Sequence, residues 1–543
     1  MERHHVKLNV TWQSKVYLDR GAVVAKAVMI QGTGSGAGKS LIAAALCRIF
    51  RDKGIDVAPF KAQNMALNSF ITKEGGEIGR AQALQAKAAR LDPSNDMNPV
   101  LLKVSGESGS QVIIQGRVHA TMTARGYYAF RDEAWKAVVE SYARLSEGHD
   151  LIVIEGAGSP AEINLMDVDI VNMAMARHAR APVILVGDID KGGVFASLYG
   201  TVRLLGRDSR RIRGFLINKF RGDMAILEPG LEMIRKKTKR PVLGVIPYIH
   251  DIGLPEEDGL TLERRPRPVS CEAGAVKIVV VRLKYISNFT DFDPFVIEHG
   301  VELFYSDNPV EIEDADIVIL PGSKNTVSDL MLLKQGGIDE SIKRAYESGA
   351  MVIGICGGYQ MLGKVIRDPH RIESHFREVE GIGLLNIETV FNQQKTTCRV
   401  EAEVIDPSLW ACFEPCILKG YEIHMGESSG DIGLFRIKRV SPSFLLGKDK
   451  PDAGPLHIED MTQYPEIILD GSANRNCWGT YLHGIFENDS FRAAILNHAR
   501  ARNGLSPINS CVSYADYQEA AIDRLARLVE GCIDVDAVWR MIA

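Results

Sequence analysis

Short apolar runs that alternate with stretches of helical spacing dominate the chain and predict parallel β-sheets. In the first half these runs lie at residues 27–31, 57–60, 151–154, 183–187 and 214–218. Each run ends in a polar or glycine-rich loop, and residues 39–52 predict a helix after the first of them. Strands that are apolar throughout are typical of a parallel sheet covered by helices on both faces. Ligands of such sheets bind at the carboxyl ends of the strands, so polar residues at these ends are candidate site residues.

A second series of apolar runs predicts a second domain. These runs lie at 277–283, 317–320, 352–355 and 478–482, and helical segments follow at 491–502 and 515–541. Proline, glycine and alternating charges between the two series predict a linker. We therefore expect an α/β protein with two domains, each a mainly parallel sheet flanked by helices. The expected boundaries are an N-terminal extension at 1–24, a first domain at 25–252, a linker at 253–275, a second domain at 276–500 and a C-terminal helical segment at 501–543.

Composition supports this division and excludes several classes of function. A chain of 543 residues, 45% hydrophobic and 24% charged, is typical of a globular protein with more than one hydrophobic core. Its net charge of −5 gives no reason to expect nucleic acid or a membrane as partner. Nine scattered cysteines favour a reducing cytoplasm, and Cys412 and Cys416 lack the second Cys/His pair of a zinc site. We expect a cytoplasmic protein with small-molecule partners, and the sequence leaves a homo-oligomer open.

The strongest local motif follows the first predicted strand and opens the first predicted helix. It reads Gly32-Thr33-Gly34-Ser35-Gly36-Ala37-Gly38-Lys39-Ser40. Glycines let backbone N–H groups surround phosphate oxygens at a helix N-terminus, as in a P-loop that binds ATP. Lys39 is then expected to neutralise the β- and γ-phosphates, and Ser40 to bind Mg²⁺.

The spacing of this loop departs from the commonest P-loop. That pattern would put glycine at position 33, where Thr33 stands, and Gly32 lies one residue earlier. The longer form resembles the loop of dethiobiotin synthetase and its relatives. The resemblance implies phosphate transfer to a carboxylate rather than simple hydrolysis of ATP.

Polar residues follow the other strands of the first half. Lys61 is a candidate for the γ-phosphate or a substrate carboxylate, or is a solvated surface lysine. Glu155 and Asp188 are candidate Mg²⁺ ligands, with Asp190 beside the second, although all three also suit turns. Asn218 is a candidate for reading the adenine edge of ATP, or is a loop residue.

A cysteine in the second half has the setting of a catalytic nucleophile. Cys356 follows an apolar strand, precedes a helix and is flanked by Gly354, Gly357 and Gly358. Small neighbours allow a strained turn, where the helix N-terminus lowers the pKa of the thiol. His483 also follows a strand, so the two are candidates for nucleophile and general base in releasing ammonia from glutamine.

Backbone groups near that cysteine are expected to stabilise the negatively charged intermediate. Backbone N–H groups near Gly322, in the loop after residues 317–320, and of Gly357 are the candidate oxyanion donors.

The two sites together resemble the cobyric acid and cobyrinic acid a,c-diamide synthase family, in which a dethiobiotin-synthetase-like P-loop domain is fused to a flavodoxin-like class I glutamine amidotransferase domain. The resemblance covers about residues 25 to 540 and implies that Gln63 and Asn64, beside Lys61, contact the substrate. The segments that carry it are Pro59–Met65, Glu77–Gln82, Glu155–Pro160, Gly187–Gly193, Leu320–Thr326 and Gly420–Gly426.

The resemblance also implies a reaction. Its cobyric acid branch amidates carboxylates b, d, e and g of adenosylcobyrinic acid a,c-diamide, using glutamine and Mg²⁺-dependent ATP, in cobalamin biosynthesis. Two alternatives stay open: a sister ligase that acts on cobyrinic acid or another polycarboxylate, and a non-catalytic P-loop switch with a decayed amidotransferase half. Intact Lys39, Ser40, Cys356 and His483 argue against the switch.

One departure concerns the expected catalytic triad. Class I amidotransferases usually have glutamate two residues after the histidine, where this chain has Ile485. The sequence therefore predicts a Cys356–His483 dyad. Glu487 is near in sequence but has no evident link to His483, and His424 is interpreted as a structural residue of the substrate domain or interface.

Overall fold

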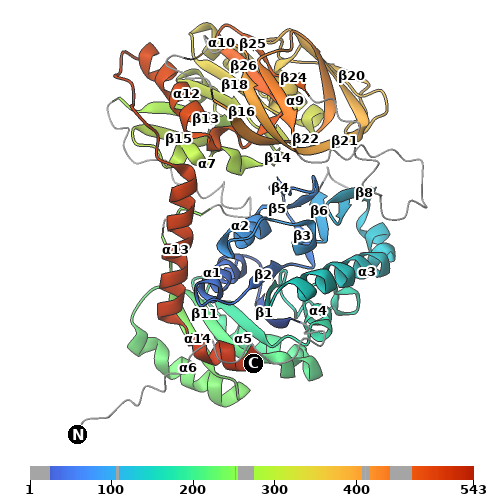
Figure 1. Cartoon of the computed structure of the whole chain (residues 1–543), viewed down its shortest axis with the longest axis vertical. Helices are drawn as coiled ribbons and strands as arrows, with labels where there is room; N and C mark the ends of the chain where they lie inside the picture. Colours follow the sequence, from blue (N-terminus) through green and yellow to red (C-terminus); the bar gives the residue numbers. More distant parts are fainter. Residues whose placement is uncertain are drawn as a thin grey trace.

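The computed structural model describes residues 25–104, 109–250, 252–254, 274–406, 410, 416–440 and 467–542. The expected N-terminal extension, most of the expected linker and Cys412 lie outside these residues. Two domains stack along the long axis of the molecule, and the C-terminal helices run beside the first domain (Figure 1).

The first domain is built on a parallel sheet of six strands. Their order is β12-β11-β10-β1-β9-β2, and all five predicted strands are among them. The bounds are β1 Lys26–Gly32, β2 Val57–Phe60, β9 Leu151–Glu155, β10 Val183–Asp188, β11 Ile212–Phe220 and β12 Val242–Pro247. Helices α3 (Ala124–Gly148), α4 (Met173–His178), α5 (Val194–Leu204) and α6 (Met224–Thr238) share one apolar core with this sheet. Helix α1 (Lys39–Asp52) belongs to the core on the other face.

Smaller elements extend this domain toward the second one (Figure 1). A sheet in the order β3-β6-β7-β8 is formed by β3 (Gln63–Met65), β6 (Val100–Val104), β7 (Ser110–Ile114) and β8 (Arg117–Met122). Strands β4 (Ser69–Ile71) and β5 (Glu77–Gly79) form a hairpin that leads into α2 (Arg80–Ala88).

The second domain also contains a six-stranded sheet, in the order β15-β13-β16-β18-β26-β25. All its strand pairs are parallel except that of the edge strand β25 (Ser472–Asn474). The others are β13 Val276–Val281, β15 Val301–Ser306, β16 Ile317–Leu320, β18 Met351–Ile355 and β26 Cys477–Thr480. Helices of this domain are α7 Asp293–Val296, α8 Pro309–Glu313, α9 Thr326–Gln335, α10 Ile338–Glu347, α11 Gly357–Leu362 and α12 Asp489–Arg502.

A second, largely antiparallel sheet in this domain was not predicted. It contains β19 Val365–Arg367, β20 Glu378–Glu380, β21 Ile387–Val404, β22 Leu418–Gly430, β23 Phe435–Arg439, β24 Ile468–Asp470 and β27 Leu482–His483. The long strands β21 and β22 carry interface residues. A short antiparallel pair, β14 (Ile286–Ser287) with β17 (Gly322–Ser323), lies apart from both sheets.

The C-terminal segment forms two helices that pack on the first domain. Helices α13 (Tyr514–Cys532) and α14 (Val535–Ile542) share an apolar core with α1. The buried Arg48 of α1 pairs with Glu519 at 2.8 Å and with Asp523 at 2.6 Å. The chain therefore returns to its first domain after completing the second.

The interface between the domains is polar and specific. The backbone N–H of Ser69 donates to the Asn288 side-chain oxygen at 3.1 Å, and Tyr421 donates to the Ser69 carbonyl at 3.3 Å. Arg80 pairs with Glu487 at 2.5 Å. These contacts attach the β4–β5 hairpin and the start of α2 to the second domain.

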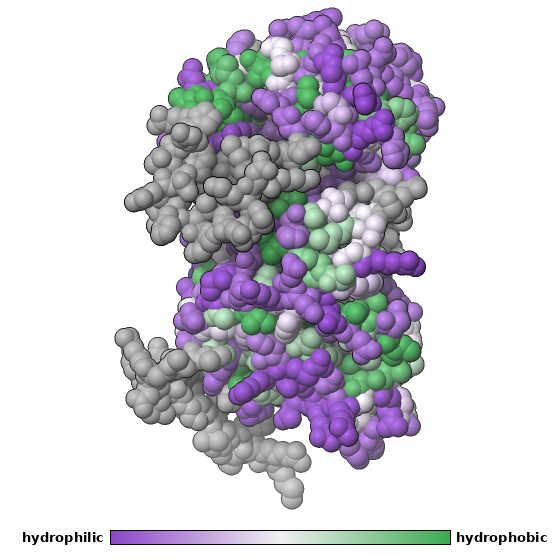
Figure 2. All heavy atoms as spheres, turned by 90° about the vertical axis from the view of Figure 1, so that its right-hand side faces the viewer, coloured by the Kyte–Doolittle hydropathy of each residue, from purple (hydrophilic) through white to green (hydrophobic). Residues whose placement is uncertain are grey.

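The visible surface is mostly polar. Figure 2 shows hydrophilic residues spread over both domains, with hydrophobic residues in smaller groups. Within the described ranges, no helix combines the length and the apolar character that crossing a membrane requires.

Candidate active sites

The glycine-rich loop between β1 and α1 has the conformation expected of a phosphate cradle. Gly36 and Gly38 have φ angles of 70° and 91°, in the left-handed region that favours glycine. A Cβ atom on Gly38 would lie 2.1 Å from the Asn218 amide nitrogen. Lys39 folds over the loop and donates to the Gly34 carbonyl at 3.1 Å and to the Gly158 carbonyl at 3.3 Å.

Glu155 lies at the centre of the polar groups beside this loop. One of its carboxylate oxygens accepts hydrogen bonds from Ser40 at 2.8 Å and from Lys61 at 3.0 Å. The other accepts from Gln85 at 2.6 Å and Gln82 at 3.2 Å. Burial opposes ionisation, but Lys61 and Gln85 outweigh it and hold the pKa of the Glu155 carboxyl below its usual value.

This arrangement fits a magnesium ion in part. The adjacent Ser40 hydroxyl and Glu155 carboxylate are the hard oxygen donors that Mg²⁺ takes from a protein when phosphates and water complete its shell. Asp188, the third expected ligand, accepts instead from Lys219 at 3.1 Å. Lys219 also donates to the Gly36 carbonyl at 2.7 Å, so the Asp188–Lys219 pair stabilises the glycine-rich loop.

The remaining expected contacts lie around this centre. Asn218 donates to the Ala37 carbonyl at 2.9 Å and so supports the loop, while its role toward adenine stays a prediction. Asn64 donates to Gln82 at 2.9 Å, and Tyr127 hydrogen-bonds to Gln63. Gln85 was missed by sequence reasoning, although its spacing of three residues from Gln82 places both on one face of a helix.

Cys356 occupies a strained turn between β18 and α11. Its φ of 52° and ψ of −108° are unusual for a residue with a side chain. The glycines that follow permit close packing, because a Cβ on Gly357 would lie 2.9 Å from the Ser323 nitrogen and one on Gly358 would lie 2.0 Å from the Leu320 carbonyl oxygen. The thiol of Cys356 lies 3.6 Å from the carbonyl oxygen of Ile423.

His483 is held beside the cysteine by an acid from another part of the chain. Its Nδ1 lies 2.6 Å from the carboxylate of Asp291, and both residues are buried. The other Asp291 oxygen accepts from the Gly484 backbone at 3.3 Å. The structure therefore places beside His483 a carboxylate that the predicted dyad did not include, whereas position 485 is isoleucine. No spacing signal links residues 291 and 483, so only the fold reveals the contact.

Electrostatic interactions favour a charged cysteine–histidine pair. Burial disfavours the imidazolium, but Asp291 outweighs it and raises the pKa of His483 to about 9. Burial likewise opposes the thiolate, and the neighbouring His483 more than compensates and lowers the pKa of Cys356. A thiolate is the nucleophilic form of cysteine, so this geometry activates Cys356.

The other residues singled out near this pair have separate partners. A Cβ on Gly322 would lie 3.5 Å from Cε1 of His483, so this glycine is at the site. Glu487 pairs with Arg80 across the domain interface. His424 stacks on Tyr481 with ring centroids 3.9 Å apart and lies 3.3 Å from Glu422. The structural role expected of His424 stays a prediction, and this residue is among those that line the pocket at Cys356.

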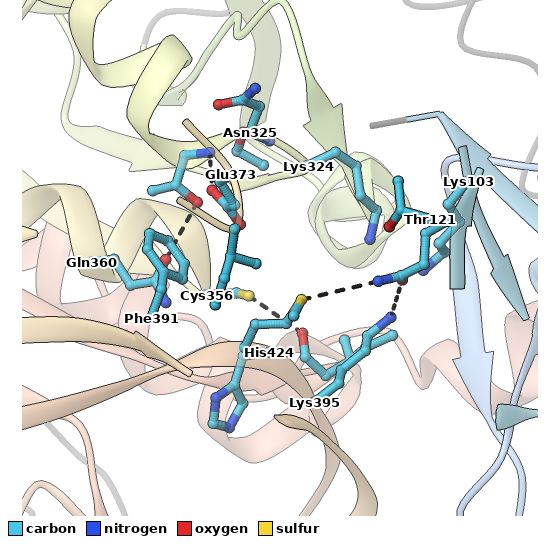
Figure 3. Close-up of a pocket in the computed structure, with 16 residues that line it drawn as sticks. Lys103, Thr121, Lys324, Asn325, Cys356, Gln360, Glu373, Phe391, Lys395 and His424 are labelled. Atoms are coloured by element: carbon cyan, nitrogen blue, oxygen red, sulfur yellow. Dashed lines mark hydrogen bonds between the residues drawn. The ribbon is translucent and has the colours of Figure 1, made fainter. Parts of the chain in front are cut away.

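A pocket between the domains opens onto Cys356 (Figure 3). The second domain lines most of it, and Lys103, Gln111 and Thr121 of the first domain complete its wall. Cys356 is thus accessible from a cavity that both domains build. Within the described ranges, no group of three or more His, Cys, Asp or Glu side chains could hold a metal ion.

Two family models match the chain, one for each domain. Residues 28–262 match a CobQ/CobB/MinD/ParA nucleotide binding domain. Residues 277–491 match a CobB/CobQ-like glutamine amidotransferase domain.

Curated relatives match nearly the whole chain. A cobyric acid synthase of Thermodesulfovibrio yellowstonii is 47% identical over 519 residues, covering 95% of this chain and 99% of that protein. A cobyric acid synthase of Caldanaerobacter subterraneus is 46% identical, covering 95% of this chain and 98% of that protein. A cobyric acid synthase of Syntrophobacter fumaroxidans is 46% identical over 523 residues, covering 95% of this chain and 99% of that protein.

Proposed function

The chain belongs to the cobyric acid synthase family of glutamine-dependent ligases in cobalamin biosynthesis, and on this premise we propose how its residues carry out the reaction. The proposed substrates are ATP, glutamine and adenosylcobyrinic acid a,c-diamide, with carboxylates b, d, e and g as the acceptors. The first domain activates a carboxylate with ATP, and the second supplies ammonia.

In the first domain, a substrate carboxylate oxygen attacks the γ-phosphorus of ATP. The bond from that phosphorus to the bridging oxygen breaks, ADP leaves, and an acyl phosphate forms. Lys39 and Lys61 stabilise the charge on the transferred phosphoryl group, and Gln82 and Gln85 hold Glu155 in place. Ser40 and Glu155 would hold Mg²⁺, which neutralises phosphate charge when bound.

In the second domain, the Cys356 thiolate attacks the side-chain amide carbon of glutamine. His483 donates a proton to the departing ammonia, which leaves a thioester on Cys356. His483 then takes a proton from water, whose attack releases glutamate and restores the thiol. Asp291 keeps the imidazole oriented and stabilises its charged form, as the acid of a triad does. Backbone N–H groups at Gly357 and near Gly322 are the proposed donors to the oxyanion.

Ammonia from the second domain then attacks the acyl phosphate. Its nitrogen bonds to the carbonyl carbon, inorganic phosphate leaves, and a proton is lost to give the amide. The observation that supports the proposal is a chain of contacts from the first domain to His483. The Ser69 backbone N–H donates to Asn288, whose amide nitrogen lies 3.4 Å from Nδ1 of His483.

The acceptor is tested by measuring ADP and glutamate release with and without adenosylcobyrinic acid a,c-diamide. The proposal predicts substrate-stimulated ADP release, and products that differ successively by the mass of one amide substitution. ADP release with cobyrinic acid but not with the a,c-diamide would favour the sister ligase instead. No ADP release with either corrinoid would contradict ligation of corrinoid carboxylates.

A further inference from the structure

Three lysines from different parts of the fold line the pocket that contains Cys356. Lys103 comes from β6 of the first domain, Lys324 from the segment between β17 and α9, and Lys395 from β21. Figure 3 shows Lys324 and Lys103 along one side of the cavity, with Lys395 below them and Cys356 across from them. Lys103 is 1% exposed and Lys395 is 5% exposed.

Lysine side chains outnumber carboxylates on this side of the pocket. Glu77 contacts both Lys103 and Lys395, the second at 2.6 Å. Lys103 also donates to the Ser69 hydroxyl at 2.6 Å, and Lys395 donates to Gln111 at 2.9 Å. The side chain of Lys324 meets that of Lys103, and burial together with this like charge lowers the pKa of Lys103. The described contacts of Glu77 are with Lys103 and Lys395 and not with Lys324, so a ligand carboxylate beside Lys324 would be stabilised here.

A carboxyl group lies at another part of the same pocket. Glu373 accepts a hydrogen bond from the Thr326 backbone at 2.8 Å. Burial, followed by the negative charge of Cys356, raises the pKa of Glu373 to about 8. Within the described ranges, no salt bridge pairs Glu373 with a lysine or arginine of this chain. A ligand ammonium group would therefore stabilise its ionised form.

We propose that this pocket binds the α-amino acid end of glutamine, with Lys324 and Lys103 receiving the α-carboxylate and Glu373 receiving the α-ammonium group. The inference rests on the proposed role of Cys356, which places the side-chain amide at the thiol. Lys103 belongs to the ligase domain, so that domain contributes a residue to the glutamine site. Glutamine binding is then complete only when the two domains are docked.

The experiment compares glutamine with two analogues in the full-length enzyme. L-Glutaminamide replaces the α-carboxylate with a neutral amide, and glutaramate lacks the α-amino group. The variants are Lys324→Met and Glu373→Gln, with Lys343→Met as a matched control on a partly exposed lysine that pairs with Glu340. The readout is kcat/KM for amidation with each nitrogen donor, alongside amidation supported by ammonium chloride.

Wild-type enzyme should prefer glutamine to each analogue by at least about tenfold, because a lost charged hydrogen bond leaves a buried partner unsatisfied. In Lys324→Met, kcat/KM should fall by at least about tenfold with glutamine and change little with L-glutaminamide. The preference for glutamine over L-glutaminamide is then lost, while the preference for glutamine over glutaramate stays. Glu373→Gln should lose the preference for glutamine over glutaramate and keep the preference for glutamine over L-glutaminamide. Amidation with ammonium chloride should persist in both, and Lys343→Met should match the wild type.

Equal losses with glutamine and L-glutaminamide in Lys324→Met would overturn the assignment of this lysine. Lys103→Met gives a second test, because it should also reduce the preference for glutamine over L-glutaminamide. If neither lysine variant changes that ratio while Cys356→Ala loses glutamine use, this inference fails and the proposed nucleophile stands. If Cys356→Ala retains glutamine use, the proposed function itself fails.

Discussion

Asp291 lies 2.6 Å from Nδ1 of His483, although the two residues are 192 positions apart in the chain. The carboxylate comes from the short 3₁₀ turn Phe289–Phe292, not from the segment after the histidine. The same turn follows Asn288, which binds Ser69 of the first domain. The acid of the proposed triad is therefore attached to the domain interface.

Substitution Asp291→Asn should shift the pH dependence of Cys356 alkylation. In the wild type, Asp291 raises the pKa of His483 to about 9, so the imidazolium persists below that pH and favours the thiolate. Without the carboxylate, burial lowers the pKa of His483 and raises that of Cys356. We expect alkylation by iodoacetamide at pH 7 to slow by at least about tenfold and to recover at higher pH.

Glu487→Gln is the matched control, because Glu487 pairs with Arg80 and not with His483. In Glu487→Gln, the pH dependence of Cys356 alkylation should match that of the wild type. If Glu487→Gln moved the profile and Asp291→Asn did not, Asp291 would not be the acid that acts on His483.

Substitution Glu155→Gln should stop ATP use without removing the reactivity of Cys356. The neutral amide removes the carboxylate charge that pairs with Lys61 and weakens the proposed Mg²⁺ site. We expect ADP release to fall by about 100-fold or more. Alkylation of Cys356 should stay at the wild-type rate, and loss of this reactivity as well would indicate misfolding. Normal ADP release in Glu155→Gln would contradict the assignment of Glu155.

Substitution Arg48→Met should destabilise the first domain through its contact with the C-terminal helix. Arg48 is 1% exposed and donates to the Ala88 carbonyl at 2.8 Å in addition to its two ion pairs. We expect the free energy of unfolding, measured with urea, to fall by about 3 kcal/mol. Arg51→Met, on the same helix but in a partly exposed pair with Asp56, should cost less than about 1 kcal/mol. Equal effects would show that the contacts of Arg48 with α13 contribute little to the stability of this domain.

The sequence predicted the parts of the fold that depend on local pattern. Apolar runs located most of the parallel strands but not β12 and β15. The loops at Gly32–Ser40 and at Cys356 were recognisable because phosphate cradles and nucleophile turns require glycine at fixed positions. Asp291 and Gln85 were missed because carboxylates and amides carry no local signature of a distant partner. The antiparallel sheet of β21 and β22 was also missed. Residues 387–404 and 418–430, which form these two strands, contain none of the predicted apolar runs.

The central claim is that Cys356 supplies ammonia to a separate ligase site. It is tested most directly by comparing Cys356→Ala with Lys39→Ala, using amidation of adenosylcobyrinic acid a,c-diamide with either glutamine or ammonium chloride as nitrogen donor. We expect that Cys356→Ala loses amidation with glutamine and keeps it with ammonium chloride, whereas Lys39→Ala loses both. Glutamine-dependent amidation that persists in Cys356→Ala would contradict this role of Cys356.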